Sequence, residues 1–324
     1  MVKLVIDMMG GDNGVNATVP AVKKLLNDFD DLFIVAVGEE DKLAELKDEK
    51  NVKIIPSKTI VPMECSVIQA MRMKDSSVNI AVNSVKNEQA DGIVSAGSTG
   101  AFLSLTTLIL KKLDGVDRPA LISPFPTLIE NKYVVLLDIG ASNENKAHEL
   151  VQFAKMGQAY CKVIYNIDNP NFYLASNGAE EGKGSPVGQE AYTLMKEMEG
   201  FKGNIEARYV LKGDADVVVF DGYSGNIFLK SSEGMAKMMS SLMKDMFKTN
   251  IFSKIGYLLA KKGVKKMRDK MDYKKVGGAL LIGVNTIPVK AHGNSDAESF
   301  YYSCLIAYRL AKKNLIKELK EKLN

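Results

Sequence analysis

The chain has 324 residues, of which 46% are hydrophobic and 25% charged, as expected for a globular protein that buries a substantial core. Its 43 basic and 39 acidic residues give a net charge of +4, which is too balanced to indicate a nucleic-acid-binding protein. The three cysteines (Cys65, Cys161 and Cys304) are far apart and form no CxxC pair, so the sequence argues against a disulfide framework or a metal site and favours a reducing, cytoplasmic setting.

The amino-terminal sequence MVKLVIDMMGGD predicts a short strand that runs into a glycine-rich turn. It lacks the basic segment, the long apolar segment and the small-residue cleavage site of a signal peptide. No apolar run in the chain approaches the ~20 residues that a membrane-spanning helix needs. We therefore expect a protein that is soluble or, at most, peripherally associated with a membrane.

Short apolar runs alternate with helix-length amphipathic segments over most of the chain. The expected strands are residues 4–7, 33–37, 52–55, 93–95, 134–138, 172–175, 217–220 and 280–284. Apolar residues recur at helical spacing between them, for example in residues 150–160 and 191–198. This alternation predicts an α/β fold with a mostly parallel sheet that is covered by helices on both faces.

The stretch from residue 228 to about 272 interrupts the alternation, because its pattern is helical throughout. We expect two helices rich in Met and Lys that stand off the sheet. The sequence contains no internal repeat, low-complexity tract or clear linker. We therefore predict a single domain over residues 1–324 with a helical protrusion at about 228–272.

Six of the expected turns are rich in glycine and polar residues. They are DMMGGD (7–12), SAGSTG (95–100), DIGASNEN (138–145), SNGAEEGKGS (176–185), DGYSGNIFLKSSEG (221–234) and KAHGNSD (290–296). Each alone is compatible with ordinary turn chemistry. Ligands of open parallel sheets bind at the carboxyl ends of the strands, where six such turns would converge on one rim. We therefore predict a ligand site at that rim.

The turn SAGSTG joins a buried strand to an apolar helix and has two interpretations. It is either a tight turn with a Ser or Thr helix cap, or an anion cradle in which backbone amides at a helix start meet a phosphate. The stretch GAEEGKGS departs from P-loop spacing, and the chain contains no dinucleotide fingerprint, GxSxG or HExxH motif. Of the two histidines, we expect His148 at the surface and His292 in a functional turn.

The residue types in these turns suit a ligand with distributed negative charge. Backbone amides, hydroxyls, asparagines, a lysine and a histidine are the groups that hold phosphate. A reaction in which phosphate is the nucleophile needs positioning and oxyanion stabilisation, but no catalytic Ser or Cys.

Taken in order, these turns and several other segments resemble the phosphate acyltransferase family of bacterial phospholipid synthesis. The matching stretches are IDMMGGD, KDSSVNIAV (74–82), DGVDRPAL (114–121), VQFAKMGQAY (151–160), EEGKG (180–184), GGALLIGV (277–284) and VKAHGNSDAESF. The resemblance implies transfer of an acyl group from acyl-acyl carrier protein to inorganic phosphate, which yields acyl phosphate for a membrane glycerol-3-phosphate acyltransferase. It also implies a three-layer α/β/α fold like that of isocitrate dehydrogenase and phosphotransacetylase, a homodimer and no organic cofactor.

Under this resemblance, the expected catalytic residues are Lys183, Asn226 and His292, which would stabilise the oxyanion or protonate the departing sulfur. The amides of residues 97–100 and the hydroxyls of Ser98 and Thr99 would hold the attacking phosphate. The full set expected to bind phosphate or substrate is Asp7, Gly10, Gly11, Asp12, Ser95, Gly97, Ser98, Thr99, Gly100, Asp138, Gly140, Asn143, Asp221, Gly225, Lys290, Ser295 and Asp296. No metal ligand is expected.

The sequence departs from the family pattern at Ser98, where SAGNTG is usual, at Ser142, where GAN is usual, and at Ala179, where NIGEE is usual. These departures leave open which side chains touch substrate. Two alternatives therefore stay open. One is a metal- and NAD-dependent decarboxylating dehydrogenase, against which the lack of a clustered arginine set argues. The other is a non-enzymatic acyl-carrier or membrane scaffold.

The stretch FKTNIFSKIGYLLAKKGVKKM (247–267) combines an apolar stripe with a basic face. Ile251, Ile255, Leu258 and Leu259 recur at helical spacing, and five lysines crowd the polar side. Such a stripe either faces a core or lies on an anionic membrane surface. We expect these four residues to reach the lipid headgroups, and basic residues of the same helical region to contact the acidic carrier protein.

Overall fold

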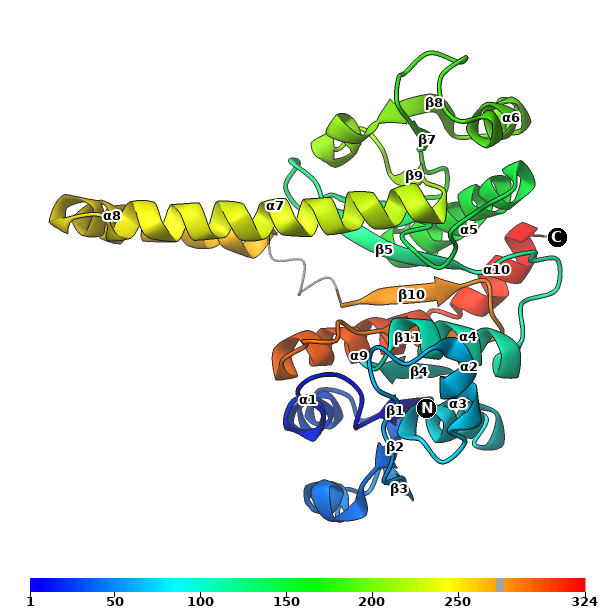
Figure 1. The fold of residues 1–324 in the computed structure, drawn as a ribbon, viewed down its shortest axis with the longest axis vertical. Coiled ribbons are helices and arrows are strands. Elements are labelled where there is room, and N and C mark those ends of the chain that lie inside the picture. Colours follow the sequence, from blue (N-terminus) through cyan, green and yellow to red (C-terminus); the bar gives the residue numbers. More distant parts are fainter. Residues whose placement is uncertain (272–276, 324) are drawn as a thin grey trace.

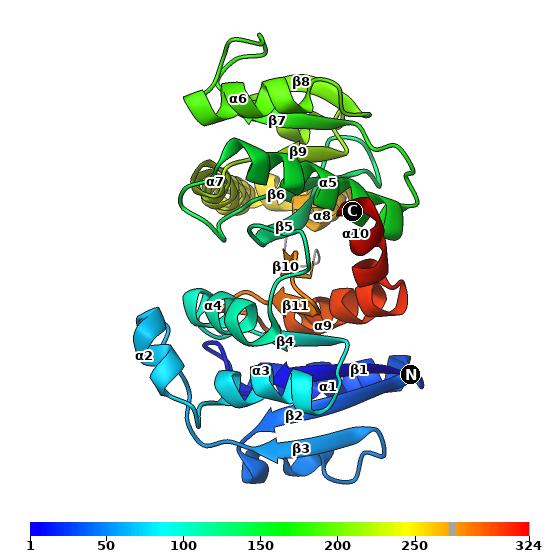
Figure 2. The ribbon, with the colours of Figure 1, turned by 90° about the vertical axis from the view of Figure 1, so that its right-hand side faces the viewer.

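The computed structural model describes residues 1–271 and 277–323; for residues 268–271 it describes the backbone only. Within these residues the strands form one eleven-stranded sheet in the order β3-β2-β1-β4-β11-β10-β5-β6-β9-β7-β8 (Figures 1 and 2). The strands are β1 (Val2–Asp7), β2 (Leu32–Gly38), β3 (Val52–Pro56), β4 (Gly92–Ser95), β5 (Ala120–Pro126), β6 (Tyr133–Leu137), β7 (Phe172–Ser176), β8 (Phe201–Glu206), β9 (Val217–Val219), β10 (Ala279–Ile282) and β11 (Ile287–Lys290).

The sheet contains two parallel groups that run in opposite directions. Strands β3, β2, β1, β4 and β11 pair in parallel, and so do β6, β9, β7 and β8. Between the groups, β10 and β5 contribute three antiparallel pairings. The prediction of a mostly parallel sheet is confirmed. The prediction that the six turns share one rim is wrong, because three reversals place the carboxyl ends of the two groups at opposite edges.

Helices cover both faces of the sheet. One face packs against α1, α5, α6, α9 and α10, and the other against α3, α4 and the first turns of α7. The helices are α1 (Val15–Asp28), α2 (Val67–Arg72), α3 (Ser77–Asn87), α4 (Thr99–Leu110), α5 (Ala147–Tyr165), α6 (Pro186–Met195), α7 (Gly222–Lys248), α8 (Ile251–Met271), α9 (Ala297–Lys312) and α10 (Leu315–Leu323), with 3-10 helices η1 (Glu40–Leu46) and η2 (Ala207–Lys212). The three-layer α/β/α architecture is therefore confirmed.

All eight expected strands fall on observed strands, and three further strands were not predicted. Strands β5 and β11 contain prolines (Pro124, Pro126 and Pro288), and proline ordinarily argues against a strand inside a sheet. Strand β8 reads FKGNIE, which is polar and contains a glycine, and it lies at one edge. Because of these features, a prediction based on apolar runs does not detect the three strands.

Helices α7 and α8 project beyond the sheet as a hairpin (Figure 1). The expected protrusion is present, but its first helix begins at Gly222, because Asp221 caps it by accepting a 2.9 Å hydrogen bond from the Ser224 amide. The expected end at residue 272 lies outside the described residues. In the described part of the chain, no helix is both long and apolar enough to cross a membrane.

Candidate functional site

A cavity of about 360 Å³ lies on one face of the middle strands, between the start of α4 and the start of α7. Its floor is β5, where Leu121, Ser123 and Phe125 alternate toward the cavity. The turns that follow β4, β6 and β11 all contribute to this cavity. The candidate site therefore lies over one face of the sheet and not at the expected shared rim. The predicted residues that line it are Thr99, Gly140, Asn226, Lys290, His292 and Ser295.

The turn after β4 is braced from behind by the turn after β1. The buried Ser95 hydroxyl donates to the Asp7 carboxylate at 2.7 Å and accepts from the Gly97 amide at 3.1 Å. A Cβ on Gly10 would lie 2.6 Å from the Gly97 nitrogen, so only glycine allows these turns to touch. Asp7, Gly10, Ser95 and Gly97 therefore shape the turn from its inner side.

Ser98 occupies the position before α4, and its side chain makes no capping hydrogen bond within the described residues. The simple capped-turn interpretation therefore does not describe this turn. Thr99 is exposed and lines the cavity, while the first amides of α4 have no partners inside the helix. Gly100 lies on the outer side of the turn, where a Cβ would be 3.6 Å from the Val67 side chain.

The turn after β11 rests on the amino-terminal turn. The Asp12 amide donates to the Gly293 carbonyl at 2.8 Å, and Asn13 donates to the Ser295 carbonyl at 2.9 Å. Gly11 adopts φ +88°, and a Cβ there would lie 2.8 Å from the Gly293 oxygen. The Asp12 backbone thus ties the two turns together, while the charge of its side chain favours the ammonium form of Lys290. Asp296 caps α9 by accepting from the Ser299 amide at 2.9 Å.

Lys290 places a buried ammonium beside this cavity. Its Nζ donates to the Ala96 carbonyl at 3.3 Å and to the Ala291 carbonyl. Burial lowers the pKa of Lys290 to about 8, although Asp7 and Asp12 oppose this shift. Burial likewise raises the pKa of Asp7, against the hydrogen bonds that it accepts. The cavity therefore contains a cation that water solvates poorly, so an anionic ligand would stabilise it.

Ser295 adds a buried polar group whose hydroxyl lacks a partner in the described part of the chain. Its hydroxyl is buried, lines the same cavity and has no hydrogen-bond partner among the described residues. Buried hydroxyls are normally paired, and those that are not call for a ligand or a water molecule. Together with Lys290, this hydroxyl makes the cavity suitable for an oxyanion.

The turn after β6 is built around the buried carboxylate of Asp138. This carboxylate accepts hydrogen bonds from the amides of Leu121, Gly140, Ala141 and Ser142 and from the Ser142 hydroxyl, at 2.6–3.0 Å. Burial raises its pKa, and these hydrogen bonds oppose that shift. Asp138 is therefore occupied in holding its own turn against β5.

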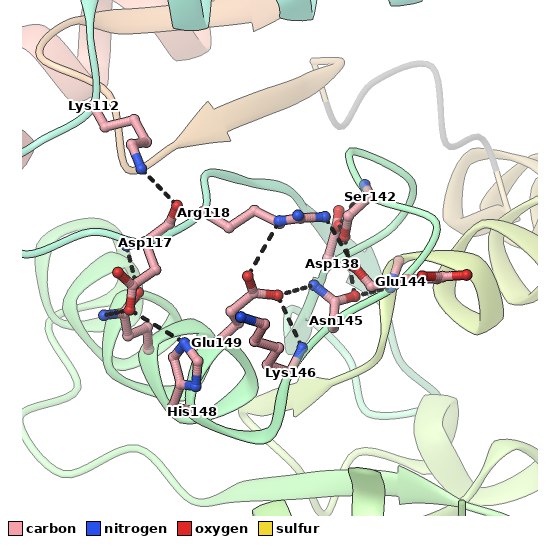
Figure 3. Close-up of polar contacts among 12 residues, drawn as sticks. Lys112, Asp117, Arg118, Asp138, Ser142, Glu144, Asn145, Lys146, His148 and Glu149 are labelled. Carbon is pink, nitrogen blue, oxygen red and sulfur yellow. Dashed lines mark hydrogen bonds and ion pairs between the residues drawn. The ribbon is translucent and has the colours of Figure 1, made fainter.

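Behind this turn runs a polar network that reaches the surface (Figure 3). Arg118 pairs with the buried Glu149 at 3.3 Å, and Glu149 accepts from Asn145 at 3.1 Å. The Asn145 side chain in turn accepts from the Gly222 amide at 3.0 Å. Asn145, rather than the exposed Asn143, thus connects the turn to α7. His148 lies outside the network, paired with Asp117 at 3.4 Å, and its expected surface location is confirmed.

The first turns of α7 bring three polar side chains to the cavity. Asn226, Lys230 and Glu233 lie on one face at helical spacing, and Asn226 packs on Gly140, whose φ is +127°. Glu233 is largely buried and pairs with His292 Nε2 at 3.1 Å, which orients the imidazole. Glu233 and Lys230 were not predicted, although counting helical positions from Asn226 would have found them.

Gly225 does not line the cavity but allows α7 to pack closely on the turn after β6. A Cβ on Gly225 would lie 1.9 Å from the Asp138 carbonyl oxygen, and one on Gly222 would lie 2.1 Å from the Ser142 carbonyl oxygen. The two glycines therefore allow α7 to sit directly on the turn after β6.

Lys183 and Asp221 line a different cavity. This larger hollow, of about 1040 Å³, lies along another side of α7 and includes Ser176, Asn177 and Asn204. Lys183 is exposed there. The structure thus brings Asn226 and His292 together and places Lys183 apart from them. In the described part of the chain, no three His, Cys, Asp or Glu side chains gather as a metal-binding group.

Comparisons with known proteins place the chain in a family. The chain matches the family described as fatty acid synthesis protein over residues 2–318. It is 40% identical over 324 residues to a phosphate acyltransferase of Staphylococcus aureus (strain MRSA252), with 99% of this chain and 98% of the relative covered. The chain belongs to the phosphate acyltransferase family. It is therefore a transferase of fatty acid and phospholipid synthesis, and the dehydrogenase and scaffold alternatives are set aside.

Solved structures of low sequence identity share the fold of this chain. A phosphotransacetylase from Streptococcus pyogenes superposes with a TM-score of 0.62 at 19% identity and covers 96% of this chain and 94% of its own. A branched-chain phosphotransacylase from Enterococcus faecalis V583 superposes with a TM-score of 0.61 at 13% identity, over 96% and 99% of the two chains. The phosphotransacetylase-like fold is thereby confirmed.

Proposed function

We propose that the protein transfers a fatty acyl group from acyl-acyl carrier protein to inorganic phosphate and releases acyl phosphate. The observation that carries this proposal is that one cavity is lined by both the buried Lys290 ammonium and the unpartnered Ser295 hydroxyl. The first turn of α4 faces the same cavity, and helix amino termini attract anions. An apolar floor beside an anion site suits an acyl group that is attacked by phosphate.

In the reaction, a phosphate oxygen attacks the thioester carbonyl carbon, and a tetrahedral oxyanion forms. Lys290, Thr99 and the α4 amides hold the phosphate, while the Asn226 amide donates to the oxyanion. Collapse of this intermediate breaks the carbon–sulfur bond, and the electron pair leaves with sulfur. His292, oriented by Glu233, accepts the proton that the attacking hydrogen phosphate loses and passes it to the departing sulfur, which yields the free thiol. Lys183 is left out of these steps because it lines the other cavity.

Thiol release from a palmitoyl carrier protein thioester tests the proposal. Free thiol should appear only when phosphate is present, and radiolabelled phosphate should be incorporated into acyl phosphate in an amount equal to the thiol released. Hydrolysis at the same rate without phosphate would instead indicate a thioesterase.

Replacing Thr99 by valine should weaken phosphate use specifically. The substitution removes one hydroxyl from the cavity and keeps the side-chain shape at the exposed first position of α4. We expect the KM for phosphate to rise roughly tenfold, as for a lost hydrogen bond to a charged group, while the KM for the acyl donor stays nearly constant. An unchanged phosphate dependence would remove Thr99 from the phosphate site.

We further propose that the acidic carrier protein docks on the basic face of α7. Lys230, Lys237 and Lys244 are exposed at seven-residue spacing on one side of this helix, and Lys230 lines the cavity. At subsaturating carrier protein, the rate should fall steeply as ionic strength rises from about 0.01 to 1 M, because charge screening slows association. A flat salt profile would show that docking is non-ionic.

The tip of the helical protrusion is proposed as a peripheral membrane contact, with the protein otherwise cytoplasmic and dimeric. Ile251, Ile255, Leu258 and Leu259 are 51–85% exposed, so within one subunit this stripe does not face a core. Lys254, Lys261, Lys262 and Lys265 are exposed on the same helix, whereas Lys266 pairs with Glu130 at 2.7 Å. Each basic residue near an anionic surface contributes roughly 1 kcal/mol. Contact at the membrane would hand the acyl phosphate to the glycerol-3-phosphate acyltransferase.

Changing Ile255 and Leu259 together to glutamate should abolish flotation with anionic liposomes. Phosphate-dependent activity in solution and the dimer mass from light scattering should be retained. Flotation that persists at the wild-type level would rule out this stripe as the anchor, and conversion to monomers would assign it to the subunit interface.

A further inference from the structure

An apolar groove leads away from the candidate cleft along α7. It has a volume of about 570 Å³, within the range of small-molecule sites. One wall is the end of β5 with the residues that follow it, from Phe125 to Leu128, and Leu211 of η2. The other wall is α7, which contributes Phe228, Met235 and Ala236, and Met267 of α8 also lines the groove.

The groove and the cleft adjoin each other. Phe125 and Glu233 line both of them, so these two side chains mark the boundary that a ligand reaching from the reacting centre into the groove would pass. The polarity changes across this boundary: the cleft holds Lys290 and Ser295, whereas most of the groove lining is apolar. A ligand that spans both must carry a polar, reactive end and an apolar tail.

We propose that this groove binds the hydrocarbon chain of the acyl donor, with the carbonyl at Asn226 and the methyl end toward α8. The inference rests on the proposed function and adds where the chain lies and what limits its length. From Asn226 to Ala236 the axis of α7 advances about 15 Å, which suits a long unbranched chain better than a two-carbon acyl group. Each buried methylene contributes about fourfold in affinity, so a groove of this kind discriminates by chain length.

Two positions on α7 can block the groove at different depths. Ser232 is next to the shared residue Glu233, and Ala236 lies one turn, about 6 Å, farther from the cleft. Both are partly buried, so a larger side chain at either position projects into the groove. Met238 is half-exposed on the same helix but does not line the groove, and it provides the matched control position.

The test compares wild type with Ser232→Trp, Ala236→Trp and Met238→Trp on carrier-protein thioesters from four to eighteen carbons. We expect both blocking variants to keep the wild-type rate on the shortest donor and to lose at least tenfold in kcat/KM on the longest. Ser232→Trp should set its cut-off several methylenes shorter than Ala236→Trp does, and Met238→Trp should match wild type. Ala236→Leu, a milder change, should lower only the rate on the longest chains.

A direct binding measurement separates this inference from the proposed function. Palmitate labelled with a fluorophore should bind wild type and Met238→Trp, and at least tenfold more weakly Ala236→Trp. If wild type shows no phosphate-dependent thiol release with any donor, the proposed reaction fails while this binding still tests the groove. Equal loss at every chain length, unchanged palmitate binding, or a change of oligomeric mass without a change of chain-length profile would overturn the inference and assign the groove to another partner.

Discussion

Replacing Lys290 by methionine is expected to lower kcat/KM for phosphate by about a hundredfold or more, the effect typical of removing one donor that stabilises reacting charge. The ammonium is buried and lines the cavity that holds the Ser295 hydroxyl and Thr99. Methionine keeps the length of the side chain and removes the charge. The measurement is thiol release at varied phosphate concentration.

The pH dependence of the reaction should reflect the ionisation of Lys290. Because burial lowers the pKa of Lys290 to about 8, the side chain loses its charge well below the range of an exposed lysine. The kcat/KM for phosphate, which reports the free enzyme, should therefore fall as the pH rises above about 8. Bound phosphate favours the ammonium, so the corresponding limb of kcat should lie at higher pH.

Lys23→Met is the matched control, since Lys23 is an exposed lysine of α1 that pairs with Glu45 at 3.0 Å. It should retain the wild-type rate and pH profile. If Lys290→Met lowers kcat/KM for phosphate less than threefold, or keeps the alkaline limb, Lys290 does not act on phosphate and serves only to tie its turn to Ala96.

The sequence predicted most of the layers but missed the strands that make the floor of the site. Strand β5 supplies that floor and β11 carries Lys290, yet both contain prolines that conceal them. The unpredicted strands also explain why the prediction of a shared rim was wrong. With β5 unrecognised, nothing in the apolar runs signals that the chain reverses between the two parallel groups. Strand direction depends on pairing across the sheet, which a local pattern does not record.

Individual side-chain positions were predicted less well than the turns that carry them. Each of the six polar turns lines one of the two cavities or braces a turn that does, but Lys183 lines the second cavity rather than the first. Asn143, expected to bind substrate, is exposed and does not line the first cavity, whereas Asn145, two residues further on, links the turn to α7. The sequence of a turn does not record which of its side chains faces inward. Glu233 was missed for a different reason: the expected helix begins only at residue 228, so Asn226 falls before it, whereas α7 begins at Gly222 and carries both residues on one face.

The close packing of α7 on the turn after β6 predicts the largest loss of stability in the chain. Gly225→Ala would place a Cβ 1.9 Å from the Asp138 carbonyl oxygen, which is backbone and cannot rotate away. Either α7 or the turn must shift. We expect the free energy of unfolding to fall by about 3 kcal/mol or more, at the upper end of overpacking effects. Urea unfolding followed by far-ultraviolet circular dichroism measures this change.

Gly234→Ala in the same helix is the control, because a Cβ there meets nothing within 4 Å. Alanine is the better helix former, so this variant should be more stable than wild type by roughly 0.5–1 kcal/mol. The same glycine-to-alanine change is thus expected to lower the free energy of unfolding at residue 225 and to raise it at residue 234, nine residues further along α7. Turnover should separate them too, since displacing α7 moves Asn226 and Glu233 away from Gly140 and His292. Equal stability of the two variants would mean that α7 does not rest on Asp138, and the geometry derived for Asn226 and Glu233 would fall with it.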